Sequence, residues 1–129
     1  MESKTILTRF IQKVWNEKDF ECIPNFVFYE YTIHSDSSDP YEFKTLNYEE
    51  FAMRLDYSFD SFPDINFEIQ STISDENNVA ITWIMTGTNS CKGVLLPTHK
   101  AIRTNGITIY HFNDGKICGH TQPYDNIVN

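Results

Sequence analysis

Apolar residues recur with helical spacing at the start of the chain. Between residues 3 and 15 they stand at three- and four-residue intervals, and polar residues fill the positions between them. This pattern predicts an amphipathic helix that Ser3 can cap. A shorter helix is predicted over residues 20–26, where Pro24 limits it to about one turn.

A third helix is predicted over residues 47–62. Asn47 and Glu50 have the spacing of a capping box, in which each side chain bonds the backbone N–H of the other. The apolar stripe of this helix consists of Phe51, Leu55, Phe59 and Phe62. Pro63 then ends it.

The remaining segments alternate with a period of 2, which predicts strands. The earliest, residues 26–35, is rich in aromatic and β-branched residues and ends near His34. The polar loop SDSSDP follows it. After the third helix, alternation predicts four further strands, over residues 65–70, 79–86, 102–112 and 116–125.

Two turns set the predicted pairing of these strands. If residues 76–78 form a three-residue loop, Asp75 lies opposite Val79, Ile69 lies opposite Met85, and the large odd-numbered residues share one face. A two-residue loop would place Ile69 opposite Ile84 and divide the apolar residues between both faces. We therefore predict the first register.

The last hairpin turns at residues 113–115. A three-residue loop there pairs His111 with Ile117. One face of the hairpin then carries His111, Gly119, Thr121 and Asp125, and the other carries Cys118, His120 and Gln122.

This order of elements predicts an α+β domain that spans residues 1–129. Helices gathered on one side of a strongly bent sheet give a cone-shaped, curved antiparallel sheet packed against three helices. A cavity between the helices and such a sheet is the expected small-molecule site.

Composition and charge narrow the possible partners. Hydrophobic residues make up 40% of the 129 residues and aromatic residues 15%, which is typical of a folded domain. The net charge is −8 and the ten basic residues form no cluster, so neither nucleic acid nor an anionic membrane is expected as a partner. No apolar run has the length of a signal peptide or a membrane span, and we expect a cytoplasmic protein.

The three cysteines, Cys22, Cys91 and Cys118, lack CxxC spacing and are odd in number. We expect free, buried thiols rather than a zinc site or a disulfide framework. His34, His111 and His120 also lack the local spacing of metal ligands, so no metal site is predicted.

Four short motifs occur in a recognisable order: FPD at residues 62–64, TGTNSCKG at 86–93, LPTHK at 96–100, and DGKI at 114–117 with Asp125 eight residues further on. In this order they resemble the SnoaL-like polyketide cyclases of the nuclear transport factor 2-like superfamily. The family patterns are GTHxG, PTGK, and DGKI with a Trp and an Asp downstream. This chain has Asn89, His99 and Thr121 in place of the His, the Gly of PTGK and the Trp.

The resemblance implies a cavity for a hydrophobic, polyketide- or steroid-like ketone and chemistry without a cofactor. Enzymes of this family close a ring by an aldol step, which needs one group that removes and then returns a proton in an apolar pocket. By the resemblance that group is Asp125, with His34 at the cavity mouth and His111 at a polar pocket position. Superfamily members often pair through the open face of the sheet, so a homodimer is expected.

Other interpretations of the same residues stay open. Asp125 can be a solvated carboxylate near the end of the chain, and His34 a surface residue. A direct contact between His111 and Asp125 needs a sharp bend, because Asp125 lies about 26 Å beyond Ile117 along a straight strand at ~3.3 Å per residue.

Further residues can contact a ligand. Trp83, Tyr29 and Tyr110 can wall a flat molecule, and Thr121 shares the face of His111, although core packing explains Trp83 equally well. Asp36 and Asp39 resemble the early carboxylate of ketosteroid isomerases, but an Asp before Pro is ordinary turn chemistry, which we prefer. A non-catalytic binding module and a dimerising accessory domain are the alternative functions.

Overall fold

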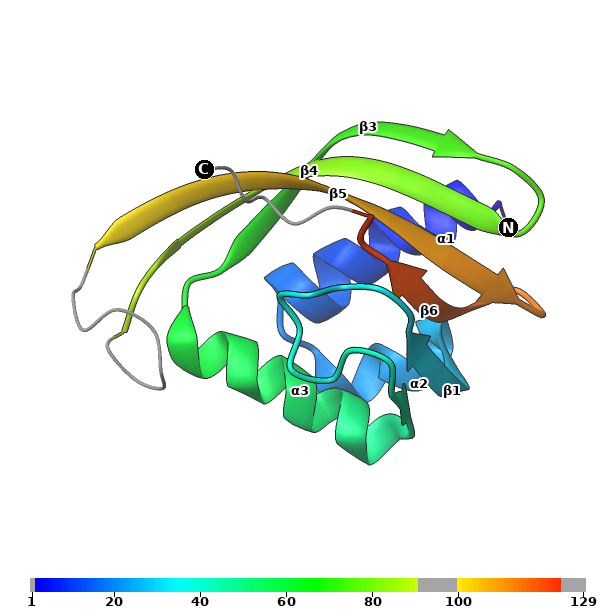
Figure 1. Ribbon diagram of the computed structural model, residues 1–129, viewed down its shortest axis with the longest axis horizontal. Coiled ribbons are helices and arrows are strands. Elements are labelled where there is room, and N and C mark those ends of the chain that lie inside the picture. Colours follow the sequence, from blue (N-terminus) through cyan, green and yellow to red (C-terminus); the bar gives the residue numbers. More distant parts are fainter. Residues whose placement is uncertain (1, 91–99, 124–129) are drawn as a thin grey trace.

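The computed structural model describes residues 2–90 and 100–123. A curled sheet lies over the helices (Figure 1). In chain order the elements are α1 (Ser3–Phe10) continuing as a π-helical turn (Ile11–Asn16), a 3-10 turn (Phe20–Cys22), α2 (Ile23–Phe26), β1 (Val27–Ile33), β2 (Thr45–Leu46), α3 (Tyr48–Ser61), β3 (Asn66–Ser74), β4 (Asn78–Thr88), β5 (Ala101–Asn113) and β6 (Lys116–Thr121).

The three predicted helices are present. The capping box of α3 forms as predicted, because the Asn47 side chain accepts from the Glu50 N–H at 2.9 Å and Glu50 accepts from the Asn47 N–H at 3.0 Å. At α1, however, Glu2 occupies the N-cap position and Ser3 is already helical. No helix among the described residues is long and apolar enough to cross a membrane.

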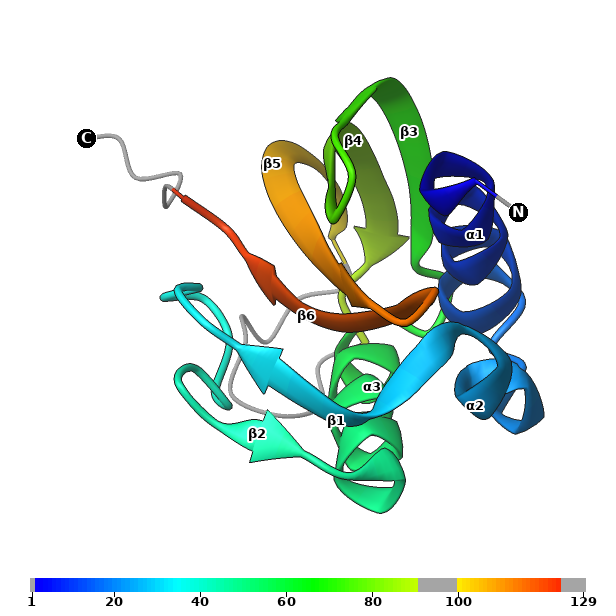
Figure 2. The same cartoon turned by 90° about the vertical axis from the view of Figure 1, so that its right-hand side faces the viewer.

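The six strands form one sheet in the order β2-β1-β6-β5-β4-β3. The α+β class and the curved sheet over three helices are confirmed, and Figure 2 shows the sheet curling without closing. One pair, β1 with β6, is parallel, so the sheet is mixed rather than wholly antiparallel. Gly119 permits this close pairing, because a Cβ there would collide with the carbonyl oxygen of Thr32.

The first predicted hairpin register is wrong near its turn. Ser74 pairs with Val79, because the Asp75 carboxylate accepts from the N–H groups of Asn77 and Asn78 and so belongs to the turn. A bulge between Ile69 and Ser71 then shifts the register again. Beyond it Ile69 pairs with Trp83 and Phe67 with Met85, so these apolar residues share a face as predicted.

The second hairpin register also differs by one residue. Asp114 and Gly115 both have positive φ, 53° and 78°, and form a two-residue turn, so Phe112 pairs with Ile117. A bulge at Cys118 follows, after which His111 pairs with Gly119 and Tyr110 with His120. The bulge places Ile117 and His120 on the same face.

We call the side of the sheet that faces α1 and α3 the inner face. It carries Ile81, Trp83, Thr108, Tyr110 and His120, and the opposite, outer face carries Thr82, Ile107, His111 and Thr121. The core lies between the inner face and the helices. Its fully buried residues include Leu7, Phe10, Val14, Val27, Tyr31, Ile33, Phe51, Leu55, Val79 and Ile117.

Candidate functional site

A cavity of about 190 Å³ opens between the inner face, α3 and the loop of residues 34–44 that joins β1 to β2. Its wall is largely apolar, with side chains that include Ile11, Trp15, Phe67, Ile69, Ile81, Trp83 and Met85. Five of its polar side chains gather at one end, and these are Asp36, Asp39, Arg54, Tyr110 and His120. An apolar hollow with a few converging polar groups is the usual form of a small-molecule site.

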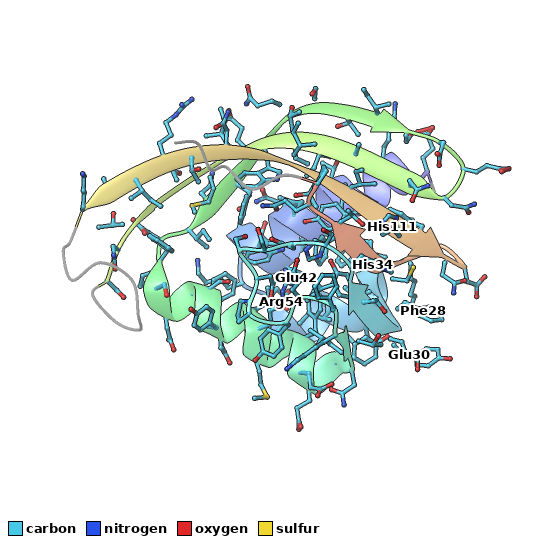
Figure 3. All side chains as sticks on the ribbon, viewed as in Figure 1. Phe28, Glu30, His34, Glu42, Arg54 and His111 are labelled. Carbon is cyan, nitrogen blue, oxygen red and sulfur yellow. The ribbon has the colours of Figure 1, made fainter. Side chains whose placement is uncertain are left out.

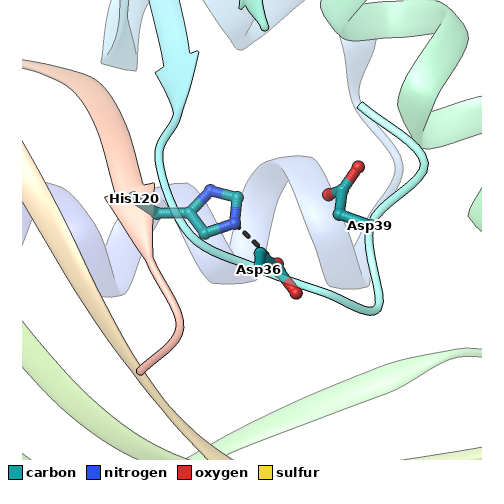
Figure 4. Close-up of side chains that lie close together, drawn as sticks. All are labelled: Asp36, Asp39 and His120. Carbon is teal, nitrogen blue, oxygen red and sulfur yellow. Dashed lines mark hydrogen bonds and ion pairs between the residues drawn. The ribbon is translucent and has the colours of Figure 1, made fainter. Parts of the chain in front are cut away.

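A buried chain of hydrogen bonds lies at the polar end of the cavity. His120 Nε2 lies 2.8 Å from Asp36 Oδ2, and His120 Nδ1 lies 2.6 Å from the Tyr31 hydroxyl (Figure 4 shows the first of these bonds). Asp36 is 5% exposed and His120 2% exposed. The second carboxylate oxygen of Asp36 accepts from the hydroxyl and the N–H of Ser38.

The parallel pairing of β1 with β6 brings Asp36 and His120 together. It continues past the end of β1, since the His34 N–H donates to the His120 carbonyl and the Gln122 N–H to the Ser35 carbonyl. The loop therefore runs alongside β6 and sets Asp36 beside the His120 ring. Within the loop, Asp36 and Asp39 also accept backbone N–H groups two residues on, as the predicted turn chemistry requires.

The surroundings of the pair decide its protonation. Burial raises the pKa of Asp36, but hydrogen bonds from His120 and Ser38 outweigh this effect, and the pKa lies below its ordinary value. Burial lowers the pKa of His120, and its bond to Asp36 opposes this only in part. At neutral pH the pair is thus an Asp36 carboxylate and a neutral imidazole, which donates from Nε2 and accepts the Tyr31 O–H at Nδ1.

A second charged pair lies next to the first. Arg54 of α3 donates from Nε to Asp39 Oδ2 at 2.7 Å, and both side chains are almost fully buried. The other Asp39 oxygen accepts the Tyr41 N–H. Burial lowers the pKa of Arg54, but the charge of Asp39 more than compensates, so the pKa is raised and the guanidinium stays charged.

Asp36, Asp39 and His120 are the one group among the described residues that could hold a metal ion. Their oxygen and nitrogen atoms lie within 4.8 Å of one another. Two carboxylates and an imidazole suit a divalent transition metal. A metal would, however, have to displace the Arg54 cation from Asp39 and the His120 ring from Asp36. The arrangement therefore fits paired side chains better than a metal centre.

The model of the SnoaL-like polyketide cyclase family matches residues 5–128. The chain belongs to this family. Comparison with proteins of curated function gave no significant match.

Solved structures agree with this membership of the SnoaL-like family. The chain is 32% identical to a candidate polyketide cyclase from Acidithiobacillus ferrooxidans, over 96% of this chain and 88% of that one, with a TM-score of 0.85. IdmH, a candidate polyketide cyclase from Streptomyces antibioticus, is 18% identical over 98% and 94% of the chains, with a TM-score of 0.81. A SnoaL-like polyketide cyclase from Agrobacterium tumefaciens is 17% identical over 98% and 93%, with a TM-score of 0.75. The last two show the fold alone.

The residues predicted from SnoaL-like motifs occupy different places. Asp125 and His99 lie outside the described residues. His34 and His111 lie together, with ring centroids 5.2 Å apart, on the outer face (Figure 3). His111 bonds Asn78 and Thr121 there. Within the described part of the chain, His34, His111 and Thr121 are absent from the cavity wall.

Two of the predicted ligand-contacting residues do line the cavity of this SnoaL-like protein. Trp83 and Tyr110 are in its wall, and the Trp83 indole N–H donates to the Thr108 hydroxyl at 2.9 Å. Tyr29 is 60% exposed and stacks near Phe28, away from the described cavity wall.

The sequence did not predict a cavity position for Asp36, Arg54 or His120 at the polar end. The sequence predicts a turn at Asp36 and places His120 on the face opposite His111, and it indicates no role for Arg54. One signal was available, because Asp36 and Asp39 were noted as carboxylates early in the sheet. The parallel pairing that joins Asp36 to His120, 84 residues away, has no signature in local sequence.

Proposed function

We propose that this protein is a cofactor-independent enzyme of the cyclase or isomerase type. It would move a proton on a small, largely apolar carbonyl compound. The observation that supports this most is the Asp36–His120 pair at the wall of an otherwise apolar cavity. Family membership supports the same class of chemistry.

Asp36 is the proposed base. It is ionised at neutral pH, and its hydrogen bonds hold its carboxylate in place. The carboxylate takes the proton from the carbon next to the ligand's carbonyl. The C–H electron pair forms the C=C bond of an enolate, and the π pair of the carbonyl moves to its oxygen. The enolate then either attacks a second carbonyl or is reprotonated at another carbon. The same carboxyl returns the proton, so no external reactant is consumed.

The cavity volume limits the ligand. About 190 Å³ is below the usual range for drug-sized ligands, roughly 300–1,000 Å³. We therefore propose a ligand with one or two rings, or a part of a larger ketone that enters with one end. The aromatic side chains Trp15, Trp83 and Phe67 favour a flat, apolar body.

Deuterium exchange at an acidic C–H tests this without knowledge of the natural substrate. We would follow 2-tetralone in D₂O by NMR with and without the protein. The expected result is protein-dependent exchange that Asp36→Asn slows by about 100-fold or more, with the fold unchanged. Ligand binding without any acceleration of exchange would contradict catalysis and support the non-catalytic binding module instead.

Asp125→Asn belongs in the same assay. Asp125 stays the acid/base residue predicted from family resemblance, and we propose Asp36 from the cavity geometry. If Asp125→Asn slows exchange and Asp36→Asn does not, the assignment to Asp36 is wrong. If both variants slow exchange, two carboxyl groups share the proton transfers.

Cofactor independence has its own test. Prolonged dialysis against a chelator should leave the exchange rate unchanged, because the Arg54 cation already neutralises the charge of Asp39. Loss of activity that one divalent ion restores would instead make Asp36, Asp39 and His120 metal ligands.

We also propose a cytoplasmic homodimer that pairs through the outer face. Ile107 on this face is 47% exposed, and apolar side chains opposite a cavity are the mark of such an interface. Ile107→Glu should shift the mass measured by light scattering from dimer to monomer. A wild-type protein that is monomeric at high concentration would contradict the dimer.

A further inference from the structure

Arg54 brings a positive charge to the cavity wall from the middle of α3 (Figure 3). Its side chain is 11% exposed, and within the described part of the chain its guanidinium makes one hydrogen bond, from Nε to Asp39. Every fully buried side-chain N or O atom of the described residues has a partner. The two terminal amino groups of Arg54 have no hydrogen-bond partner among the described residues, so they are not fully buried. Because Arg54 lines the cavity, these groups are accessible from it.

Packing fixes this cation in place. Its central carbon lies 5.7 Å from the ring centre of Phe51 and 5.9 Å from those of Tyr31 and Trp15. Cation–π contacts of this kind hold a guanidinium without using its N–H donors. The terminal groups are thus preorganised donors.

Tyr110 supplies a second donor to the same cavity. The Tyr110 side chain lines the cavity wall, and its hydroxyl makes no hydrogen bond to any described residue. Burial raises the pKa of Tyr110 to about 12, so the hydroxyl keeps its proton at neutral pH. The charge of Arg54 also acts on the Tyr110 hydroxyl, which places the two donors in one electrostatic environment.

We infer that Arg54 and Tyr110 form an oxyanion subsite that binds the carbonyl oxygen of the ligand and holds it more strongly as an enolate. The inference deepens the proposed function. Binding of an enolate rests on that function, whereas the unengaged donors of Arg54 and Tyr110 do not depend on it. The ligand class is a small enolisable carbonyl compound or a phenol.

The positions of the charged groups fit this assignment. Asp39 lies 2.7 Å from Arg54 and within 4.8 Å of the Asp36 and His120 ligand atoms, so base and cation are neighbours at one end of the cavity. Proton removal by Asp36 leaves negative charge on the adjacent oxygen. Fixed donors aimed at developing charge in a water-poor site are a large contribution to catalysis. Asp39 engages only Nε, which leaves the rest of the fork for the ligand.

The test uses 4-nitrophenol, whose phenolate is a stable mimic of an enolate with its own visible absorbance. Titrations at several pH values give the affinities of the phenol and the phenolate. We expect the wild-type protein to prefer the phenolate. Arg54→Lys, which keeps the charge but loses the fork, and Tyr110→Phe should each weaken phenolate binding by about tenfold or more.

Two controls separate fold from function. Arg9→Lys, on the exposed face of α1, should leave binding unchanged. Arg54→Lys can lower the unfolding temperature strongly. In that case phenolate binding is measured in Tyr110→Phe and in the double variant Arg54→Gln with Asp39→Asn. The double variant leaves no unpaired buried charge. Wild-type affinity in these variants, or a wild-type protein that binds no phenolate, would overturn the subsite.

Asp36→Asn distinguishes this inference from the proposed function. It removes a negative charge from the cavity, so phenolate binding should be unchanged or tighter while deuterium exchange is lost. Arginine-dependent phenolate binding in a protein that never accelerates exchange would leave the subsite standing and refute catalysis. If Arg54→Lys and Tyr110→Phe both leave the rate of deuterium exchange unchanged, catalysis would stand and the oxyanion subsite would be refuted.

Discussion

His120 and His111 lie on neighbouring strands of one hairpin but on opposite faces of the sheet, and they have opposite surroundings. His120 is buried on the inner face, where its ring is hydrogen-bonded to a tyrosine hydroxyl and a carboxylate. His111 is half-buried on the outer face between an amide oxygen and a threonine hydroxyl, next to His34. Only the first ring is joined to a charged group that lines the cavity.

The partners also give the two rings opposite tautomers. Asp36 accepts a hydrogen bond from the Nε2–H of His120. The Asn78 amide nitrogen donates to Asp75, so its oxygen faces His111 and accepts a hydrogen bond from the Nδ1–H of that ring. A neutral network can orient a ring, but it cannot share a proton with a base. The comparison therefore supports the proposal that the inner histidine takes part in the chemistry, and it favours a structural role for the outer one.

The largest expected difference is in turnover. His120→Gln keeps a side chain that can hydrogen-bond Asp36 but cannot share its proton, and it should slow deuterium exchange of 2-tetralone by about 100-fold. His111→Gln should change the rate by less than about threefold. The reverse ranking would show that the outer cluster acts on the ligand, as the family resemblance predicted for His111.

A smaller difference is expected in stability. Tyr31→Phe leaves the buried Nδ1 of His120 without its donor, which should cost about 1–3 kcal/mol in the free energy of unfolding. Thr121→Val removes the corresponding donor from His111, where water can replace it, and should cost less than about 1 kcal/mol. Urea unfolding of both variants measures this, and equal losses would contradict the contrast in burial.

The smallest expected effect is the pH dependence of stability. Burial lowers the pKa of both His120 and His111. As pH falls through about 6.5, the unfolded chain therefore takes up protons before the folded protein does, and stability declines until the folded rings also protonate.

His120→Gln should flatten this decline more than His111→Gln, because His120 is more deeply buried and the nearby Arg54 charge also disfavours its protonation. Melting temperatures from pH 7.5 to 5 provide the measurement. If the melting temperature of the double variant His120→Gln with His111→Gln still falls as steeply with pH, the pH dependence arises elsewhere in the molecule.

The fold was largely predictable because its signals are local. Helical spacing, the Asn47–Glu50 capping box and strand alternation each depend on residues within a few positions of one another. The grouping of His111 with Thr121, opposite His120, was likewise correct. What alternation cannot give is which of two faces lies inside, and the bulge at Cys118 moves His120 to the face of Ile117.

The candidate site was less predictable because it depends on contacts between distant segments. The turn interpretation of Asp36 was correct but incomplete. One carboxylate oxygen serves the turn and the other meets His120. Arg54 gave no sequence signal, since an isolated arginine in an amphipathic helix is usually solvated. Trp83 and Tyr110 were predicted as ligand contacts from their aromatic character alone, and both line the cavity.

Nitrogen-15 NMR of the imidazole rings tests the central claim most directly. Long-range proton–nitrogen spectra report the tautomer and environment of each histidine with and without saturating 4-nitrophenol. We predict that His120 is protonated at Nε2 and shifts when the ligand binds, whereas His111 is protonated at Nδ1 and stays unchanged. A ligand that shifts His111 and leaves His120 untouched would contradict the inner-face site.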